Sequence, residues 1–184
     1  MRRVNKDAYY MRMAKVAASR GDCLGTRAGT VIVVDDRIVS TGFNGAPDGV
    51  THCSDGGCPR CEAKAEGIIQ SGENLDKCLC VHAEENAILS AARHGIRLSG
   101  CDIYTTVQPC LGCLRQIIQV RANRVLYRNE YPLARSTRVA YDRLCRESSL
   151  TVSRTGRRSR AKEVRMDDSL DAFQEESGDG SGRA

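Results

Sequence analysis

Tryptophan is absent from this 184-residue chain, and aromatic residues make up only 4% of it. Proteins that bind single-stranded nucleic acid stack bases on aromatic side chains and follow the backbone with a basic groove. The body of the chain has few such side chains and no dense run of Lys or Arg, so its net charge of +5 does not by itself indicate nucleic acid. A small anionic substrate suits this charge equally well, and we expect no nucleic-acid partner.

Long hydrophobic runs are also missing. No segment approaches the roughly 18 apolar residues that a membrane span needs, and the first twenty residues, MRRVNKDAYYMRMAKVAASR, hold no apolar run of signal-peptide length. We therefore expect a soluble cytoplasmic protein, with access to the nucleus left open and no membrane partner.

Cysteine, in contrast, is abundant, with ten residues in a chain of this length. Disulfides are rare in the reducing compartment expected here, so metal binding explains the cysteines better.

Hydrophobic periodicity predicts the elements of one α/β domain. We expect helices over residues 6–20, 82–94, 110–120 and 134–147, and strands over residues 31–34, 38–43, 101–107, 124–127 and 150–152. Residues 44–81 read as irregular. This order predicts a single sheet between helices, with parallel strands in its second half.

The expected domain covers residues 1–152 and contains a cysteine-rich insert at about 50–81. Residues 153–184 read as a disordered, charged tail. The seven basic residues of this tail cancel its seven acidic residues, so the excess positive charge belongs to the domain.

Two motifs carry the predicted chemistry. His82 and Glu84, in HAEENAI, open one expected helix, and Cys110 and Cys113, in PCLGC, open another. One imidazole and two thiolates are three ligands of a tetrahedral zinc whose fourth position stays open for catalysis. Helix N-termini favour thiolates, and Glu84 is close enough to move protons at such a site.

Each motif alone has a plainer interpretation, because a histidine near a helix start is often a cap residue and a Cys-x-x-Cys pair often holds structural zinc. The combination of His-x-Glu with Pro-Cys-x-x-Cys is the general signature of zinc-dependent nucleobase deaminases. We therefore predict a catalytic zinc site with Glu84 as general acid and base.

Five of the remaining cysteines lie in the insert, and Cys23 precedes the first expected strand. Cys58-Pro-Arg-Cys61 has zinc-knuckle spacing, and a glycine-rich insert with few apolar residues needs something other than a core to order it. The predicted ligands of a structural zinc are four of a set of five, with Cys80 as a spare and His52 as a possible substitute: Cys23, Cys53, Cys58, Cys61 and Cys78. Burial as small reduced hydrophobes is the alternative, and it suits Cys101 and Cys145.

With these motifs, the chain resembles the deoxycytidylate (dCMP) deaminase family of the cytidine deaminase superfamily over nearly all of residues 7–152. Further similar segments are GDCLGTRAGTVIV, STGFNGAPDG and HCSDGGCPRC. The resemblance implies a three-layer α/β/α sandwich with a mixed five-stranded sheet. It also implies zinc-dependent hydrolysis of dCMP to dUMP and ammonia, which feeds thymidylate synthesis.

The resemblance further implies roles for individual residues. Asn44 matches a residue that contacts the sugar, Tyr131 one near the phosphate or base, and Arg27 a basic residue that helps to bind phosphate. Arg93 matches an arginine linked to subunit contacts and regulation. A second zinc in the insert, a homo-hexamer, activation by dCTP with Mg²⁺ and inhibition by dTTP are also implied. The chain departs from the family at Arg121, where relatives usually have glycine after the second metal-binding helix.

Three other functions remain open at this stage. The enzyme could deaminate another free cytosine nucleotide, such as dCTP or a modified dCMP. It could act on cytosine within a polynucleotide, which the scarcity of aromatic residues disfavours. A catalytically silent zinc scaffold is the third, although such a scaffold has no need for Glu84.

Overall fold

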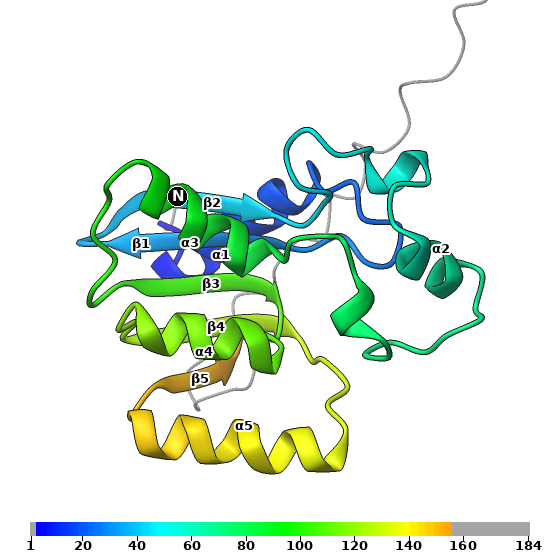
Figure 1. Ribbon diagram of the computed structural model, residues 1–184. Helices are drawn as coiled ribbons and strands as arrows, with labels where there is room; N and C mark the ends of the chain where they lie inside the picture. The colour runs from blue at the N-terminus through cyan, green and yellow to red at the C-terminus, as the bar shows by residue number, and fades with distance from the viewer. Residues whose placement is uncertain (1–2, 156–184) are drawn as a thin grey trace, which may run out of the picture.

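The computed structural model describes residues 3–155, and these residues form one mixed β-sheet between layers of helices (Figure 1). The strands are β1 (Gly29–Val34), β2 (Arg37–Phe43), β3 (Asp102–Val107), β4 (Arg124–Asn129) and β5 (Thr151–Arg154), in the spatial order β2-β1-β3-β4-β5. β1 is antiparallel to β2 and β3, whereas β3, β4 and β5 run parallel. The predicted five-stranded α/β sandwich, with its parallel second half, is confirmed.

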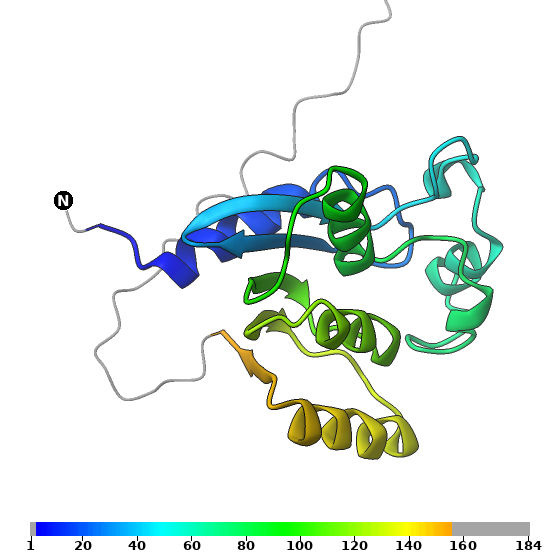
Figure 2. The same ribbon diagram turned by 60° about the vertical axis from the view of Figure 1, so that its left-hand side comes forward.

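The alternation of side chains along the strands separates two hydrophobic cores. Val31 and Val33 on β1 pack with α1 (Lys6–Ala18), whereas Ile32 between them packs against the opposite layer. That layer contains α3 (Ala83–Arg93), α4 (Leu111–Gln119) and α5 (Arg135–Ser148). Figures 1 and 2 show α1 on one face of the sheet and these three helices on the other.

The turn between β1 and β2 needs only Asp35 and Asp36, both of which have positive φ (47° and 60°). Two such residues give the mirror-image turn whose twist matches an antiparallel pair, and Asp tolerates this conformation. The strands expected over residues 31–34 and 38–43 thus form a hairpin, and Arg37 belongs to β2, where it pairs with Val34.

The segment 44–81 is more regular than predicted. It contains a short helix, α2 (Pro59–Ala65), and two 3₁₀ turns, Cys53–Asp55 and Leu75–Lys77. Pro59 stands in the first turn of α2, where its missing N–H costs nothing. The sequence pattern gave no signal for this helix because seven residues are too few to show an apolar stripe.

The C-terminal boundary also differs from the prediction. Ser153 and Arg154 pair with Leu126 and Tyr127 of β4, so the last strand continues two residues into the segment assigned to the tail. Residues 156–184 of that tail lie outside the described residues. Within residues 3–155, none of the helices has both the length and the apolar character that a membrane crossing requires.

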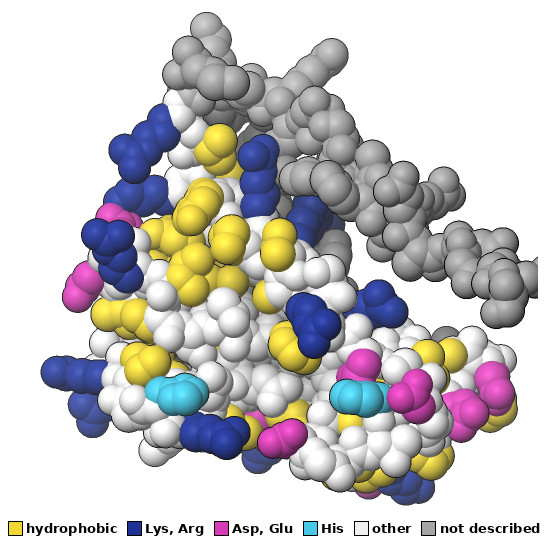
Figure 3. Space-filling view, turned by 90° about the horizontal axis from the view of Figure 1, so that it is seen from above, with side chains coloured by type: hydrophobic (Ala, Val, Ile, Leu, Met, Phe, Trp, Pro, Cys, Tyr) yellow, Lys and Arg dark blue, Asp and Glu magenta, His cyan; other side chains and the backbone are white. Residues whose placement is uncertain are grey.

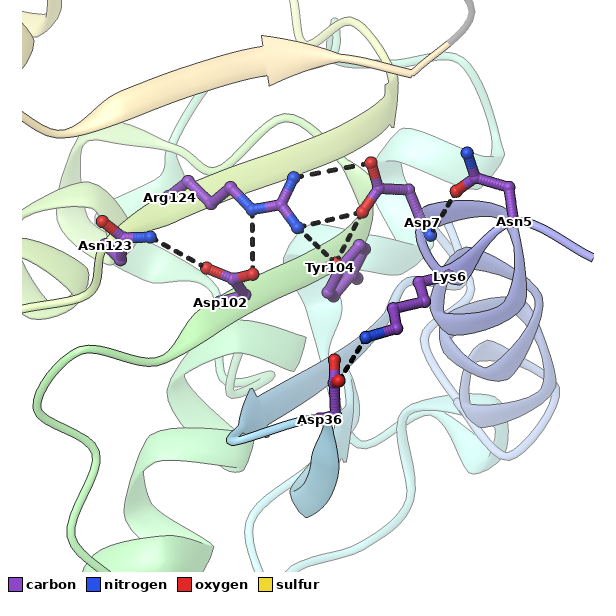
Figure 4. Close-up of polar contacts among 8 residues, drawn as sticks. All are labelled: Asn5, Lys6, Asp7, Asp36, Asp102, Tyr104, Asn123 and Arg124. Atoms are coloured by element: carbon purple, nitrogen blue, oxygen red, sulfur yellow. Dashed lines mark hydrogen bonds and ion pairs between the residues drawn. The ribbon is translucent and has the colours of Figure 1, made fainter.

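A network of polar side chains joins α1 to the end of the sheet at which β3 and β4 begin (Figure 4). The guanidinium of Arg124 on β4 donates to Asp102 on β3 (2.8 Å) and to Asp7 on α1 (3.0 Å). The Tyr104 hydroxyl donates to Asp7 (2.8 Å) and accepts from Arg124 (2.9 Å). This network holds three elements that are far apart in the sequence.

Candidate active site

The predicted site residues come from loops that meet at one edge of the sheet. Since β3 and β4 are parallel, their carboxyl ends lie side by side, and Cys110 and Tyr131 follow those ends. The antiparallel direction of β1 relative to β3 places the end of β2 at the same edge, where Asn44 follows. Open α/β sheets bind ligands at this kind of edge.

Three predicted metal ligands converge there. His82 is the N-cap of α3 and Cys110 the N-cap of α4, so both helices direct their N-termini at one point. The Nδ1 atom of His82 lies 3.4 Å from the Sγ atoms of both Cys110 and Cys113. An imidazole nitrogen and a thiolate sulfur on one tetrahedral zinc stand about 3.6 Å apart. The observed spacing therefore fits a single zinc ion.

The three side chains also change one another's proton affinity. Hydrogen bonds from Cys113 and His82 lower the pKa of the Cys110 thiol to about 4, whereas its hydrogen bond to Cys110 raises the pKa of His82 to about 9. The hydrogen bond with Cys110 and burial raise the pKa of Cys113. Zinc binding requires a neutral imidazole and two thiolates, so an ion bound here would displace the protons that His82 and Cys113 hold in its absence.

Glu84 is buried, with only 5% of its surface exposed, and lines the pocket next to His82. Burial raises its pKa above the ordinary value for a carboxyl group. The Thr105 hydroxyl on β3 donates to Oε1 of Glu84 (2.8 Å), and the Thr30 hydroxyl on β1 donates to that of Thr105 (3.0 Å). This chain of hydroxyls fixes the carboxylate at the pocket, a contact that the sequence analysis did not anticipate.

Asn44 and Tyr131, predicted to bind substrate, both line the same pocket. Asn44 is buried and spans the loop before β1, because its Nδ2 donates to the Thr26 carbonyl (2.7 Å) and its Oδ1 accepts from the Ala28 N–H (2.7 Å). The Tyr131 hydroxyl is buried and, within the described residues, has no hydrogen-bond partner.

The positively charged side chains that line the pocket differ from Arg27, the one that was predicted to bind phosphate. Arg27 is exposed and is not among the lining residues, although its neighbours Thr26 and Ala28 are. Arg60 and Lys64, both on α2, line the pocket instead. Sequence reasoning missed them because α2 itself was not predicted. Their spacing of four residues on one helix face is the signal that would have paired them.

Five cysteines of the insert and Cys23, from the loop before β1, gather beside the pocket. Cys23, Cys53, Cys61 and Cys80 form one group whose sulfur atoms all lie within 4.8 Å of one another. Cys58, Cys61, Cys78 and Cys80 form a second. Cys80, expected to be the spare, therefore belongs to both groups, because the extended backbone at Cys78 turns it and Cys80 to the same side.

The remaining residues that were considered as ligands, interface residues or buried thiols do not belong to these two cysteine groups. The exposed His52 pairs with Asp22 through its Nδ1 (2.9 Å). Arg93 is exposed at the end of α3, so its predicted role in subunit contacts stays a prediction. Cys101 is fully buried within the core, and Cys145 on α5 is partly buried against it.

Comparison with known proteins connects this site to a family. Deoxycytidylate deaminase of Schizosaccharomyces pombe is 42% identical over 125 residues, which are 68% of this chain and 37% of the relative. The corresponding enzyme of Mycobacterium phage D29 is 37% identical over 131 residues, which are 71% of this chain and 99% of the relative. The chain thus spans less than two fifths of the yeast protein and nearly all of the phage protein.

Solved structures agree with the sheet order and the helix layers. The crystal structure of dCMP deaminase from the cyanophage S-TIM5, in complex with dCMP and dUMP, has a TM-score of 0.62 at 25% sequence identity. The similarity covers 84% of this chain and 99% of that one. The cytidine deaminase-like fold is therefore confirmed.

The profile of the family "Cytidine and deoxycytidylate deaminase zinc-binding region" matches residues 4–129, which include His82, Glu84, Cys110 and Cys113. With its motifs brought together at one edge of the expected fold, this chain belongs to the cytidine and deoxycytidylate deaminase family.

Proposed function

We propose that this protein hydrolyses dCMP to dUMP and ammonia. The observation that supports this most directly is the convergence of His82, Cys110 and Cys113 beside the buried Glu84. Relatives that carry the name deoxycytidylate deaminase match the segment that holds all four residues. The dUMP formed is the substrate class that a methyl transfer to C5 would convert into thymidylate.

A zinc ion held by His82, Cys110 and Cys113 supplies a Lewis acid and a nucleophile derived from water at neutral pH. Glu84 accepts a proton from the water that attacks C4 and delivers protons to the ring nitrogen N3 and to the leaving amino group. Thr105 holds Oε1 of Glu84 in position for both transfers. In the overall reaction, one water is consumed and one ammonia is released.

The substrate is proposed to lie with its sugar near Asn44 and its phosphate toward Arg60 and Lys64. Lys64 already donates to the Gly25 carbonyl (3.0 Å) and the Thr26 hydroxyl (2.9 Å), which places its ammonium at the pocket wall. Tyr131 lines the same pocket and is proposed to contact the ligand there. Arg27, outside the lining, is the weaker candidate for phosphate binding.

Substrate choice is tested by steady-state assays with dCMP, deoxycytidine, dCTP and single-stranded DNA on one sample. We expect the highest kcat/KM with dCMP. Preference for dCTP would favour the alternative of another free cytosine nucleotide. Turnover of DNA without turnover of dCMP would reject the proposal in favour of a polynucleotide deaminase.

The proton transfers are tested with Glu84→Gln, which keeps the shape of the side chain and removes its basicity. We expect kcat to fall by at least about 10²-fold, because positioned acid–base groups contribute 10²–10⁴-fold. The zinc content, measured on the same sample by mass spectrometry, should stay at the wild-type value. Normal turnover by this variant would exclude Glu84 as the proton shuttle.

We propose that the chain forms a homo-oligomer, with a hexamer as the form that the family resemblance suggests. Among residues 3–155, β2 pairs only with β1 and leaves one edge open. Large hydrophobic side chains are exposed on the neighbouring elements: Phe43 on β2, Val16 on α1 and Leu89 on α3. Figure 3, viewed from the β2 side, shows hydrophobic side chains gathered on this face. Such edges and patches are typical of interfaces.

Regulation by dCTP with Mg²⁺ and by dTTP, with Arg93 at an intersubunit site, is part of the same proposal. Sedimentation velocity with and without these nucleotides measures the assembly, and activity curves measure cooperativity. Hyperbolic kinetics that dCTP does not change would exclude this regulation. We also propose that the protein is located in the cytoplasm, with access to the nucleus. The reducing conditions there keep cysteine thiols available for metal.

A further inference from the structure

The sulfur atoms of Cys23 and of five cysteines in the insert form two groups of four that share Cys61 and Cys80, and within each group all sulfurs lie within 4.8 Å of one another. We propose that they bind two zinc ions in one Zn₂Cys₆ cluster, in which the thiolates of Cys61 and Cys80 bridge both ions. Cys23 and Cys53 complete one tetrahedron, and Cys58 and Cys78 complete the other. This cluster is separate from the His82 centre and does not depend on the substrate proposed above.

The distances fit metal coordination rather than disulfides. Two thiolates on one tetrahedral zinc stand about 3.8 Å apart, given Zn–S bonds of about 2.3 Å. The sulfur of Cys61 lies 3.6 Å from that of Cys23, 3.6 Å from that of Cys78 and 3.8 Å from that of Cys80. A disulfide would need about 2.05 Å. Cys61 thus has coordination spacing to members of both groups at once.

Each half of the cluster has a backbone donor for one of its terminal sulfurs. The Leu24 N–H donates to Cys53 (3.4 Å), and the Leu79 N–H donates to Cys58 (3.4 Å). N–H groups aimed at sulfur stabilise the thiolate form that zinc requires. A single ion would use only one of these halves and leave the two terminal thiols of the other half without a metal.

The insert also lacks another means of folding. The hydrophobic cluster at its centre consists of cysteines: Cys23, Cys53, Cys58, Cys61 and Cys80, with Cys78 packed against them. Cys53, Cys58 and Cys61 have no exposed surface. Metal–sulfur bonds can replace a hydrophobic core in small segments of this kind.

The charge balance is consistent with two ions. Six thiols lose six protons and bind two Zn²⁺, which leaves a net charge of −2, the same as that of a single zinc with four thiolates. The second ion therefore neutralises the two further thiolates that it recruits.

The cluster also has a structural consequence for the pocket. Cys61 anchors α2, the helix that carries Arg60 and Lys64, while Cys80 lies two residues before His82. Cys23, Cys61, Cys78 and Cys80 themselves line the pocket wall. Two metal ions at this point would hold α2 and the start of α3 in a fixed relation.

The test is a metal count on the full-length protein, saturated with zinc and freed of excess metal by gel filtration. Elemental analysis should give about three zinc ions per chain, two in the cluster and one at His82. Native mass spectrometry should show the same number with all ten cysteines reduced. Two zinc ions per chain, bound iron with acid-labile sulfide, or a disulfide within the insert would each overturn the proposal.

Variants separate bridging from terminal ligands. Cys78→Ser should lose one zinc, because the group that contains Cys23 and Cys53 stays complete. Cys61→Ser should lose both cluster ions, and Cys110→Ala should lose only the catalytic ion. Cys145→Ser, outside both centres, is the matched control and should retain all three. Loss of the same number of ions from Cys61→Ser and Cys78→Ser would contradict bridging.

Where a variant fails to fold, the wild-type protein still decides the question. After exchange with ¹¹³Cd, nuclear magnetic resonance should show two signals from all-thiolate sites that are coupled to each other through shared sulfur. Two uncoupled signals, or a single one, would overturn the shared cluster. Neither result depends on turnover of dCMP, so failure of the proposed activity and failure of the cluster are distinguishable.

Discussion

Thr105 shows how one hydroxyl from the sheet can control a residue on a helix. It donates to Glu84 across the interface between β3 and α3, and it is itself fully buried. A buried carboxylate with few partners has several orientations of similar energy, so a fixed donor at 2.8 Å selects one of them. Thr105 is therefore a positioning residue that acts through Glu84.

We expect Thr105→Val to lower kcat by about tenfold, since a hydrogen bond to a charged group contributes about 1.5–3 kcal/mol. Thr105→Ser retains the hydroxyl and should recover most of the rate. The zinc content and KM should change little in both variants. Equal losses from valine and serine would show that packing, rather than the hydrogen bond, is what matters.

Cys101 belongs to neither proposed metal centre, and the burial of its thiol predicts a pH dependence of stability that can be measured. Burial raises the pKa of its thiol to about 11, from an ordinary value of 9.0. Because the folded-state pKa is the higher one, this thiol's contribution to stability is complete below about pH 9 and is lost as the pH rises through 11. The difference in unfolding free energy between wild type and Cys101→Ser should therefore shrink over this interval. Chemical denaturation at several pH values measures it, and a constant difference would contradict the assignment.

At the scale of elements, the end of α4 carries an unusual residue. The helix ends at Gln119, and Arg121 follows with φ of +58°, a left-handed conformation that costs a non-glycine residue about 1–2 kcal/mol. The N–H of Arg121 donates to the Ile118 carbonyl (2.9 Å), and its carbonyl accepts from Gly100 (2.8 Å). The backbone is thus held in the shape that glycine adopts at helix ends.

Arg121→Gly should raise the free energy of unfolding by up to about 1 kcal/mol, since it removes this strain. Arg115→Gly, within α4 and also exposed, is the matched control and should lower it by about 1 kcal/mol through reduced helix propensity. Denaturant titrations of both variants measure the effect. If Arg121→Gly and Arg115→Gly destabilised the protein equally, the left-handed conformation of Arg121 would carry no energetic cost.

The helix α2 illustrates why an element can escape sequence analysis. Its seven residues show almost no apolar periodicity. Two cysteines anchor it, Cys61 within the helix and Cys58 at the N-cap just before it. Helices this short are not stable by propensity alone. Its existence depends on contacts made by residues that the chain supplies from elsewhere, such as Cys23 and Cys80.

At the scale of the whole molecule, Arg124 connects layers that the hydrophobic cores keep apart. Its ion pairs with Asp7 and Asp102 link α1 to the sheet at the end opposite the pocket. Its side chain is only 34% exposed, so it is partly shielded from solvent. Networks of this kind contribute more than isolated surface pairs do.

Arg124→Met should therefore lower the free energy of unfolding by about 1–3 kcal/mol. It removes the charged donor shared by Asp7 and Asp102, which keep only the neutral donors Tyr104 and Asn123. Arg143→Met removes an exposed pair with Glu147 on α5 and should cost about 0.5 kcal/mol or less. Since Arg124 lies at the start of β4, and the pocket lies at the opposite ends of β3 and β4, kcat should stay near the wild-type value. A larger loss from the exposed pair than from Arg124 would contradict this ranking.

The sequence by itself determined the order of the elements, the mixed sheet and the two motifs of the catalytic centre. These follow from local chemistry: alternation along Val31–Val33, helical spacing, and ligand types such as His82 and Cys110 that few other sites combine. Only the tertiary structure decided how the six cysteines divide, that Lys64 rather than Arg27 faces the pocket, and that Thr105 supports Glu84. These features depend on distances between segments far apart in the chain, and spacing along a sequence carries no information about where an irregular insert folds back.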